Sequence, residues 1–261
     1  MMQSRMIEVS NGRAQIRVFE AGRGQDLVFF HGAGGLMPDD PFVAKLAEHY
    51  HVHAPLLPGY GDSEGAENFR DMLDVTLLAG DILDALGVKN PIVVGHSMGG
   101  MIAAELAAVA PQAIDRLVLI CPAGIWLDEH PIPDLFSLMP HEYPELLFHD
   151  VELGTRLITA GVDLENLEFL ADFLITASRQ LGMAGKILFP IPDRGLKDRL
   201  YRIRAKTIVV WGDDDRLIRP VYAKEFTGRI KGAQLIEVPA AGHMVTMEQP
   251  QKVVEAIARV A

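Results

Sequence analysis

A serine, a histidine and a run of aspartates stand at positions where they could cooperate in nucleophilic catalysis. Residues 95–99 fit the pattern G-x-S-x-G, with Ser97 at the centre. An apolar run at 92–94 precedes the pattern and good helix formers over 98–110 follow it, so we expect Ser97 on a sharp strand-to-helix turn. Such a turn exposes the hydroxyl, which becomes a nucleophile when a neighbouring base removes its proton.

The base and the acid that orients it follow in the order serine, aspartate, histidine. Three consecutive aspartates, at 213–215, come after an apolar run at 208–211, and His243 comes after another at 235–238. Each therefore lies beyond the carboxyl end of a predicted strand, the edge at which open α/β sheets place their sites. We predict Ser97 as the nucleophile and His243 as the general base. The residues alone do not choose among the three aspartates.

An acyl-transfer site also needs N–H donors for the oxyanion that forms on the substrate. The amide of Met98, at the start of the helix after the serine, is the natural first donor. The amide of Ala33 is the predicted second donor, because Gly32 and Gly34 beside it let the backbone approach a substrate closely. A dinucleotide-binding fingerprint is excluded here, because its third glycine would stand where the chain has Met37.

Strand and helix patterns alternate along most of the chain. Apolar or alternating runs typical of strands lie at 5–9, 15–19, 27–30, 51–54, 92–94, 117–121, 208–211 and 235–238. Helical spacing of apolar residues appears at 41–50, 73–87, 98–110 and 253–260. The first two strands are separated by Asn11-Gly12, a strong hairpin signal. We predict an α/β fold with a mostly parallel sheet of about eight strands and helices on both faces.

Residues 122–204 interrupt this alternation with prolines and with helical stretches rich in Leu, Phe and Met. We expect them to form a helical cap inserted after the sixth strand, while 1–121 and 205–261 form one core domain. Apolar residues of the cap and of the loops near the acid and base should line the pocket. The predicted substrate-binding residues are Gly32, Gly34, Trp126, Leu135, Phe136, Met139, Arg179, Leu217, Ile218 and Met244.

The composition excludes several classes of partner. The 261 residues include 24 Lys and Arg against 35 Asp and Glu, a net charge of −11, and no basic run offsets it. Nucleic acid and anionic membrane surfaces are therefore not expected to bind. The chain starts without an apolar signal segment, and its one cysteine allows no internal disulfide. These features favour a cytoplasmic enzyme, a monomer or homodimer, that acts on a small molecule and water.

Three histidines close together in the sequence could bind a metal or could have only a structural role. His49, His51 and His53 suggest a metal site, but we expect no carboxylate or cysteine nearby to complete a set of ligands. We therefore expect a structural or surface role for them, and no metal or other cofactor.

His96 is a separate case, because it stands beside the predicted nucleophile. On such a turn we expect it to point away from Ser97 and to pack in the core.

Four blocks of the sequence resemble the α/β-hydrolase fold superfamily. They are Phe30-His31-Gly32-Ala33-Gly34, Leu57-Pro58-Gly59-Tyr60-Gly61-Asp62-Ser63, Gly95-His96-Ser97-Met98-Gly99-Gly100, and Trp211-Gly212-x-x-Asp215 with Gly242-His243-x-x-x-x-Glu248-x-Pro250. They cover nearly the whole chain outside the predicted cap. The resemblance implies that Asp215 is the acid, because the family's acid falls four residues after the tryptophan of this motif.

The resemblance also distinguishes between reactions. Ser97 departs from the aspartate nucleophile of haloalkane dehalogenases and epoxide hydrolases. Carbon–carbon hydrolases of ring-cleavage pathways use serine, but they usually carry asparagine where this chain has His96 and tryptophan where it has Met247. An arginine of their cap binds the substrate carboxylate, a role that Arg179 could fill.

Small carboxylesterases and enol-lactone hydrolases look similar with fewer departures. We therefore expect hydrolysis of carboxylic esters of small to medium acyl substrates through an acyl-enzyme. The alternatives are carbon–carbon hydrolysis of diketo acids and enol-lactone hydrolysis. An alternative from another class is a ligand sensor without catalytic activity on the same scaffold.

Overall fold

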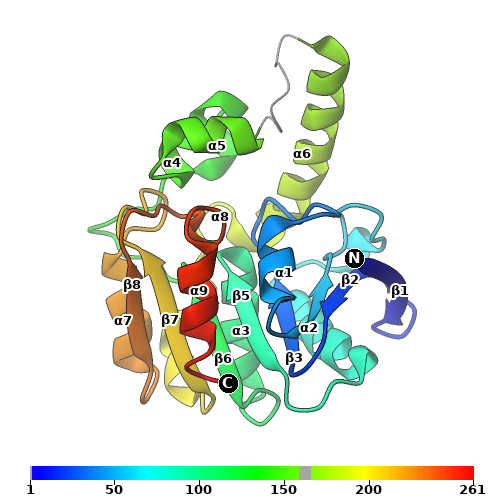
Figure 1. The fold of residues 1–261 in the computed structure, drawn as a ribbon, viewed down its shortest axis with the longest axis vertical. Coiled ribbons are helices and arrows are strands. Elements are labelled where there is room, and N and C mark those ends of the chain that lie inside the picture. Colours follow the sequence, from blue (N-terminus) through cyan, green and yellow to red (C-terminus); the bar gives the residue numbers. More distant parts are fainter. Residues whose placement is uncertain (1, 159–165) are drawn as a thin grey trace.

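A mostly parallel sheet of eight strands runs through the molecule (Figure 1). The computed structural model describes residues 2–158 and 166–261. The strands are β1 (Gln3–Val9), β2 (Ala14–Gly22), β3 (Asp26–Phe30), β4 (His51–Pro55), β5 (Ile92–His96), β6 (Arg116–Ile120), β7 (Lys206–Gly212) and β8 (Gln234–Val238). Their order in the sheet is β1-β2-β4-β3-β5-β6-β7-β8, and β3 to β8 run parallel. The predicted fold class is confirmed.

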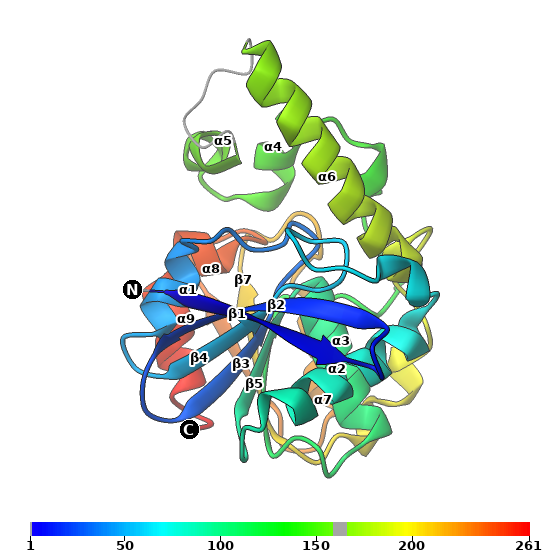
Figure 2. The ribbon, with the colours of Figure 1, turned by 90° about the vertical axis from the view of Figure 1, so that its right-hand side faces the viewer.

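Helices cover both faces of the sheet (Figures 1 and 2). On one face lie α1 (Pro41–Leu46), α8 (Val245–Glu248) and α9 (Pro250–Ile257), and on the other α2 (Met72–Leu86), α3 (Met98–Val109) and α7 (Val221–Arg229). The central strands β3, β5 and β6 are buried on both sides, which explains their continuous apolar runs. Helix α3 is buried along nearly all its length, so the segment that follows the serine is held firmly against the sheet.

Three further helices lie beyond the carboxyl ends of the parallel strands (Figure 2). They are α4 (Tyr143–Leu147), α5 (Val151–Ile158) and α6 (Leu167–Leu188), and all fall within the segment 122–204 for which a cap was predicted. Within the described part of that segment there is no strand of the sheet. Among the described residues, no helix is both long and apolar enough to cross a bilayer.

Candidate active site

Ser97 occupies the sharp turn between β5 and α3. Its backbone angles, φ 53° and ψ −114°, lie in a region that residues other than glycine rarely adopt. A Cβ on Gly95 would lie 2.3 Å from the carbonyl oxygen of Gly99, and one on Gly99 would lie 2.1 Å from that of Phe30. Neither glycine has room for a side chain, so close backbone packing holds the serine in its strained conformation.

The side chains of Ser97, His243 and Asp215 form one hydrogen-bonded row. The Nε2 atom of His243 lies 2.8 Å from Ser97 Oγ, and its Nδ1 lies 2.8 Å from Asp215 Oδ2. All three residues are buried. When Nδ1 donates its proton to the carboxylate, Nε2 is free to accept the proton of the serine hydroxyl.

Of the three consecutive aspartates, Asp215 is the one that faces His243. Its second oxygen, Oδ1, accepts hydrogen bonds from the main-chain N–H groups of Leu217 and Ile218, at 3.0 and 2.8 Å. Asp214 lies in a partly exposed ion pair instead. The folded loop thus selects the aspartate that the family resemblance implied.

The loop that carries His243 is tied to the helices above the sheet. Glu248 accepts hydrogen bonds from the main-chain N–H groups of Gly242, at 2.6 Å, and of Asp150, at 2.9 Å. The main-chain N–H of Met244 donates to the carbonyl of Leu147, the last residue of α4. These bonds couple the position of the imidazole to that of α4 and α5.

His96 is buried, and its ring makes a hydrogen bond to the neighbouring loop. Its burial agrees with the expected packing in the core, and His96 is also among the residues that line the cavity at Ser97. Its Nε2 donates to the main-chain carbonyl of His243 at 2.9 Å. Burial, followed by the effect of nearby His243, lowers the pKa of His96 to about 3, so the ring is neutral. The spacing of the motif gives no signal for this contact, which joins two distant loops.

Two buried rings hold the glycine-rich loop after β3. His31 donates from Nδ1 to the carbonyl of Gly32 at 2.7 Å, while its Nε2 accepts the N–H of Leu57 at 3.1 Å. Burial lowers the pKa of His31 to about 4, and only a neutral ring can donate and accept in this way. The hydroxyl of Tyr60 donates to the carbonyl of Ala33 at 3.0 Å. These bonds fix the peptide planes of the loop, and therefore the directions of its N–H groups.

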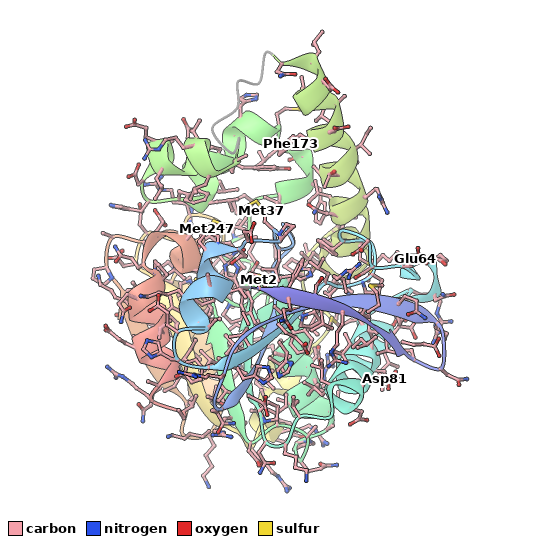
Figure 3. All side chains as sticks on the ribbon, turned by 45° about the vertical axis from the view of Figure 1, so that its right-hand side comes forward. Met2, Met37, Glu64, Asp81, Phe173 and Met247 are labelled. Atoms are coloured by element: carbon pink, nitrogen blue, oxygen red, sulfur yellow. The ribbon has the colours of Figure 1, made fainter. Side chains whose placement is uncertain are left out.

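An apolar cavity of about 300 Å³, called the main cavity below, opens at Ser97 and extends among α4, α5 and α6. Figure 3 shows Phe173 of α6 above Met37 and Met247, and all three line this main cavity. A small cavity of about 50 Å³ also reaches the serine, and Ala33 and Leu217 line both. Two spaces of unequal size therefore meet at Ser97.

Most of the predicted substrate-binding residues line one of these spaces. Gly32, Gly34, Leu135, Leu217 and Met244 line the main cavity, and Trp126, Leu135, Phe136, Leu217 and Ile218 line the small cavity. Met139 and Arg179 line neither and are exposed. Helix α6 instead turns Phe173, Ala177 and Gln180 toward the main cavity, at helical spacing, which leaves Arg179 outside it.

Asp40 is a buried carboxylate in the wall of the main cavity that sequence reasoning missed. Its Oδ1 caps α1 by accepting the N–H groups of Phe42 and Val43, both at 3.0 Å. Burial raises its pKa, and the two amide bonds oppose that rise. Within the described residues, no lysine or arginine lines either cavity or pairs with Asp40. Its position directly before Pro41 and an apolar helix was the available signal.

Comparison with known proteins places this chain in a family of hydrolases. Residues 27–256 match the model described as the alpha/beta hydrolase family. A 2-hydroxy-6-oxo-6-phenylhexa-2,4-dienoate hydrolase of Burkholderia cepacia is 28% identical over 266 residues, covering 90% of this chain and 86% of that protein.

Solved structures of low sequence identity share the fold. A membrane phospholipase A, described as a bacterial virulence factor, superposes with a TM-score of 0.78 at 22% identity, covering 99% of this chain and 85% of that one. A meta-cleavage product hydrolase of Pseudomonas fluorescens IP01 gives a TM-score of 0.74 at 21% identity, with 98% of each chain covered. At these identities the likeness extends to the fold alone.

Proposed function

Because the chain belongs to the alpha/beta hydrolase family, we propose that it hydrolyses neutral carboxylic esters, lactones included, through an acyl-enzyme on Ser97. The observation that carries the proposal is the row of 2.8 Å hydrogen bonds from Asp215 through His243 to Ser97, at the junction of two apolar spaces. A buried hydroxyl held against an imidazole and a carboxylate is the arrangement that acyl transfer requires.

The reaction follows from the positions of these groups. Ser97 Oγ attacks the ester carbonyl carbon while His243 Nε2 takes the hydroxyl proton. The amides of Ala33 and Met98 donate to the carbonyl oxygen as it gains negative charge; within the described residues, neither amide donates to another main-chain carbonyl. His243 then protonates the departing alcohol oxygen, and water activated by the same imidazole releases the acid and frees the serine.

The walls of the cavities favour a neutral, apolar substrate. Among the described residues that line the two cavities there is no lysine or arginine, while Asp40 supplies a carboxylate to the main cavity. An anionic substrate would lose its water of hydration and meet a like charge without a cation to compensate. The main cavity suits the larger apolar part of an ester, and the small cavity suits a short group on the other side of the scissile bond.

Carbon–carbon hydrolysis is the second candidate, because a relative of 28% identity is named a hydrolase of a phenylhexadienoate. The substrate in that name carries a carboxylate. In this chain Arg179 lies outside the described cavities, and Asp40 lies in the wall of the main one. The charge of the site therefore supports ester hydrolysis over this reaction.

A substrate panel separates the candidates. It contains p-nitrophenyl esters of increasing acyl length, a lactone of moderate ring size, and 2-hydroxy-6-oxo-6-phenylhexa-2,4-dienoate. We expect the highest kcat/KM on a neutral ester or the lactone. Faster cleavage of the dienoate would favour the second candidate, and binding of these compounds without turnover of any would favour the ligand sensor.

A further inference from the structure

Four polar side chains from three neighbouring strands gather at the edge of the sheet opposite the active site. The strand register brings them together, because Glu20 of β2 lies opposite His53 of β4, and Asp26 of β3 lies opposite His51 of β4. His51 and His53 are two residues apart on one strand, so their side chains share a face. Asp26 and His51 are the first residues of their strands, whereas the active site lies at the carboxyl ends.

One carboxylate oxygen connects the two imidazoles. Asp26 Oδ1 lies 2.9 Å from His51 Nδ1 and 3.0 Å from His53 Nε2, and the ring centroids are 4.3 Å apart. These three ligand atoms lie within 4.8 Å of one another. A tetrahedral zinc ion, with bonds of about 2.0–2.1 Å, requires ligand atoms separated by roughly 3.3 Å. Small side-chain rotations would therefore bring all three atoms onto one ion.

A second layer of polar groups orients the buried histidine. Glu20 Oε1 lies 3.2 Å from His53 Nδ1, the ring nitrogen that faces away from Asp26, and Arg5 Nε donates to the same Glu20 oxygen at 3.0 Å. A histidine that binds a metal through one nitrogen usually donates its other N–H to a carboxylate. Glu20 supplies that carboxylate, so it would hold the Nδ1–H of His53 once Nε2 gives up its proton to bind an ion in place of Asp26.

The exposure of the cluster suits exchange of an ion with solvent. The side chain of His53 is 4% exposed, whereas those of Asp26 and His51 are 30% and 40% exposed. The inner ligand is thus held by packing, and the outer two leave a path to water. All three stand on strands, which position side chains more rigidly than loops do.

We propose that Asp26, His51 and His53 bind one divalent transition-metal ion, with zinc as the type ion. The ligands are Asp26 Oδ1, His51 Nδ1 and His53 Nε2, and water completes the tetrahedron on the exposed side. From the sequence alone, we expect no carboxylate to complete the set. The strand register brings Asp26 of β3 next to the two histidines, although it lies 25 residues before His51 in the chain.

Zinc titration of the EDTA-treated full chain tests the site, with isothermal calorimetry in a buffer that does not chelate. We expect one zinc ion per chain for the wild type and for His49→Ala, a control that removes an exposed histidine outside the cluster. His51→Ala should weaken binding at least about 10-fold, and Glu20→Gln about 10-fold through loss of the orienting carboxylate. Far-ultraviolet circular dichroism of each variant checks that the chain is folded, whatever reaction it catalyses.

The active site offers the one competing set of ligands in the described residues, because Cys121, Asp215 and His243 also lie close together. Zinc at that set would block the imidazole and inhibit ester turnover, and Cys121→Ser would weaken its binding. The proposal is overturned if His51→Ala binds zinc as tightly as the wild type, or if the wild type binds none. Failure of this test would leave the proposed ester hydrolysis unaffected.

Discussion

His96 donates a hydrogen bond to the main-chain carbonyl of His243, with its Nε2 atom 2.9 Å from that oxygen. The bond joins the residue before Ser97 to the backbone of His243. Because burial and the neighbouring His243 keep the pKa of His96 near 3, its ring stays neutral and this contact persists across the pH range of ordinary assays. His96 is therefore a positioning residue for the His243 loop.

Replacement of His96 should separate positioning from binding. We expect His96→Ala to lower kcat about 10-fold with little change in KM, because the imidazole of His243 would lose part of its alignment with Ser97. His96→Gln should retain most of the activity, since its amide N–H can reach the same carbonyl. Steady-state kinetics on a p-nitrophenyl ester measures both. Equal losses in the two variants would show that the hydrogen bond is unimportant.

The buried neutral histidines should make the protein less stable in acid. His31 and His96 have folded-state pKa values of about 4 and about 3, against about 6.5 when unfolded. Below about pH 6.5 the unfolded chain binds protons that the folded chain does not. The free energy of unfolding should therefore fall with decreasing pH, by about 1 kcal/mol per pH unit for each histidine, until the pH reaches the folded-state value.

The contribution of one histidine can be isolated with His96→Gln. Urea unfolding at several pH values between about 6 and 4.5 gives the free energy of unfolding at each pH. This free energy should fall less steeply with decreasing pH in the variant, because its unfolding takes up about one proton fewer. Carboxylates titrate in both proteins, so their effect cancels in the comparison. Identical slopes for the two proteins would mean that His96 is not kept neutral by burial.

Asp40 should set the preference for uncharged substrates. Asparagine caps helices as well as aspartate does, so Asp40→Asn keeps the hydrogen bonds to α1 and removes the charge. We expect kcat/KM for the half-ester p-nitrophenyl hydrogen glutarate, relative to p-nitrophenyl butyrate, to rise about 10-fold, which corresponds to about 1.4 kcal/mol of relieved repulsion. An unchanged ratio would mean that the carboxylate does not act on bound acyl groups.

The turn at Ser97 should tolerate no side chain at Gly95. A Cβ there would lie 2.3 Å from a backbone oxygen, whereas one on Gly228 of α7 would meet nothing within 4 Å. Gly95→Ala should destabilise the protein by about 3 kcal/mol through overpacking. Gly228→Ala should leave stability unchanged or raise it by up to about 1 kcal/mol, because alanine favours helix. Urea unfolding compares them, and equal stabilities would contradict the close packing at the turn.

The sequence predicts Ser97 and His243 because each follows an apolar run long enough to form a buried strand. Parallel strands end at the same edge of a sheet, so residues far apart in the chain are expected to meet there. The choice of Asp215 needed the family resemblance, because three adjacent aspartates look alike in sequence. In the structure the folded loop distinguishes them, by directing the N–H groups of Leu217 and Ile218 at one carboxylate.

Other features depend on contacts that sequence patterns do not encode. The cluster of His51, His53 and Asp26 depends on the register between β3 and β4, in which Asp26 lies opposite His51. A shift of β4 by one residue would place the two histidines on the face of the sheet opposite to Asp26. Arg179 illustrates the same limit for the predicted cap. The composition predicts that this segment is helical. Which face of the helix lines the cavity depends on how α6 packs in the folded protein, and that face carries Phe173 and Ala177 rather than Arg179.

The central role of Ser97 is tested most directly by the kcat of Ser97→Ala on p-nitrophenyl butyrate, measured beside the wild type. Alanine removes only the hydroxyl oxygen, so the fold, the cavities and the bond between His243 and Asp215 should remain. If Ser97 forms the acyl-enzyme, kcat should fall at least about 10⁴-fold. A value within about 10-fold of the wild type would contradict the assignment of Ser97 as nucleophile.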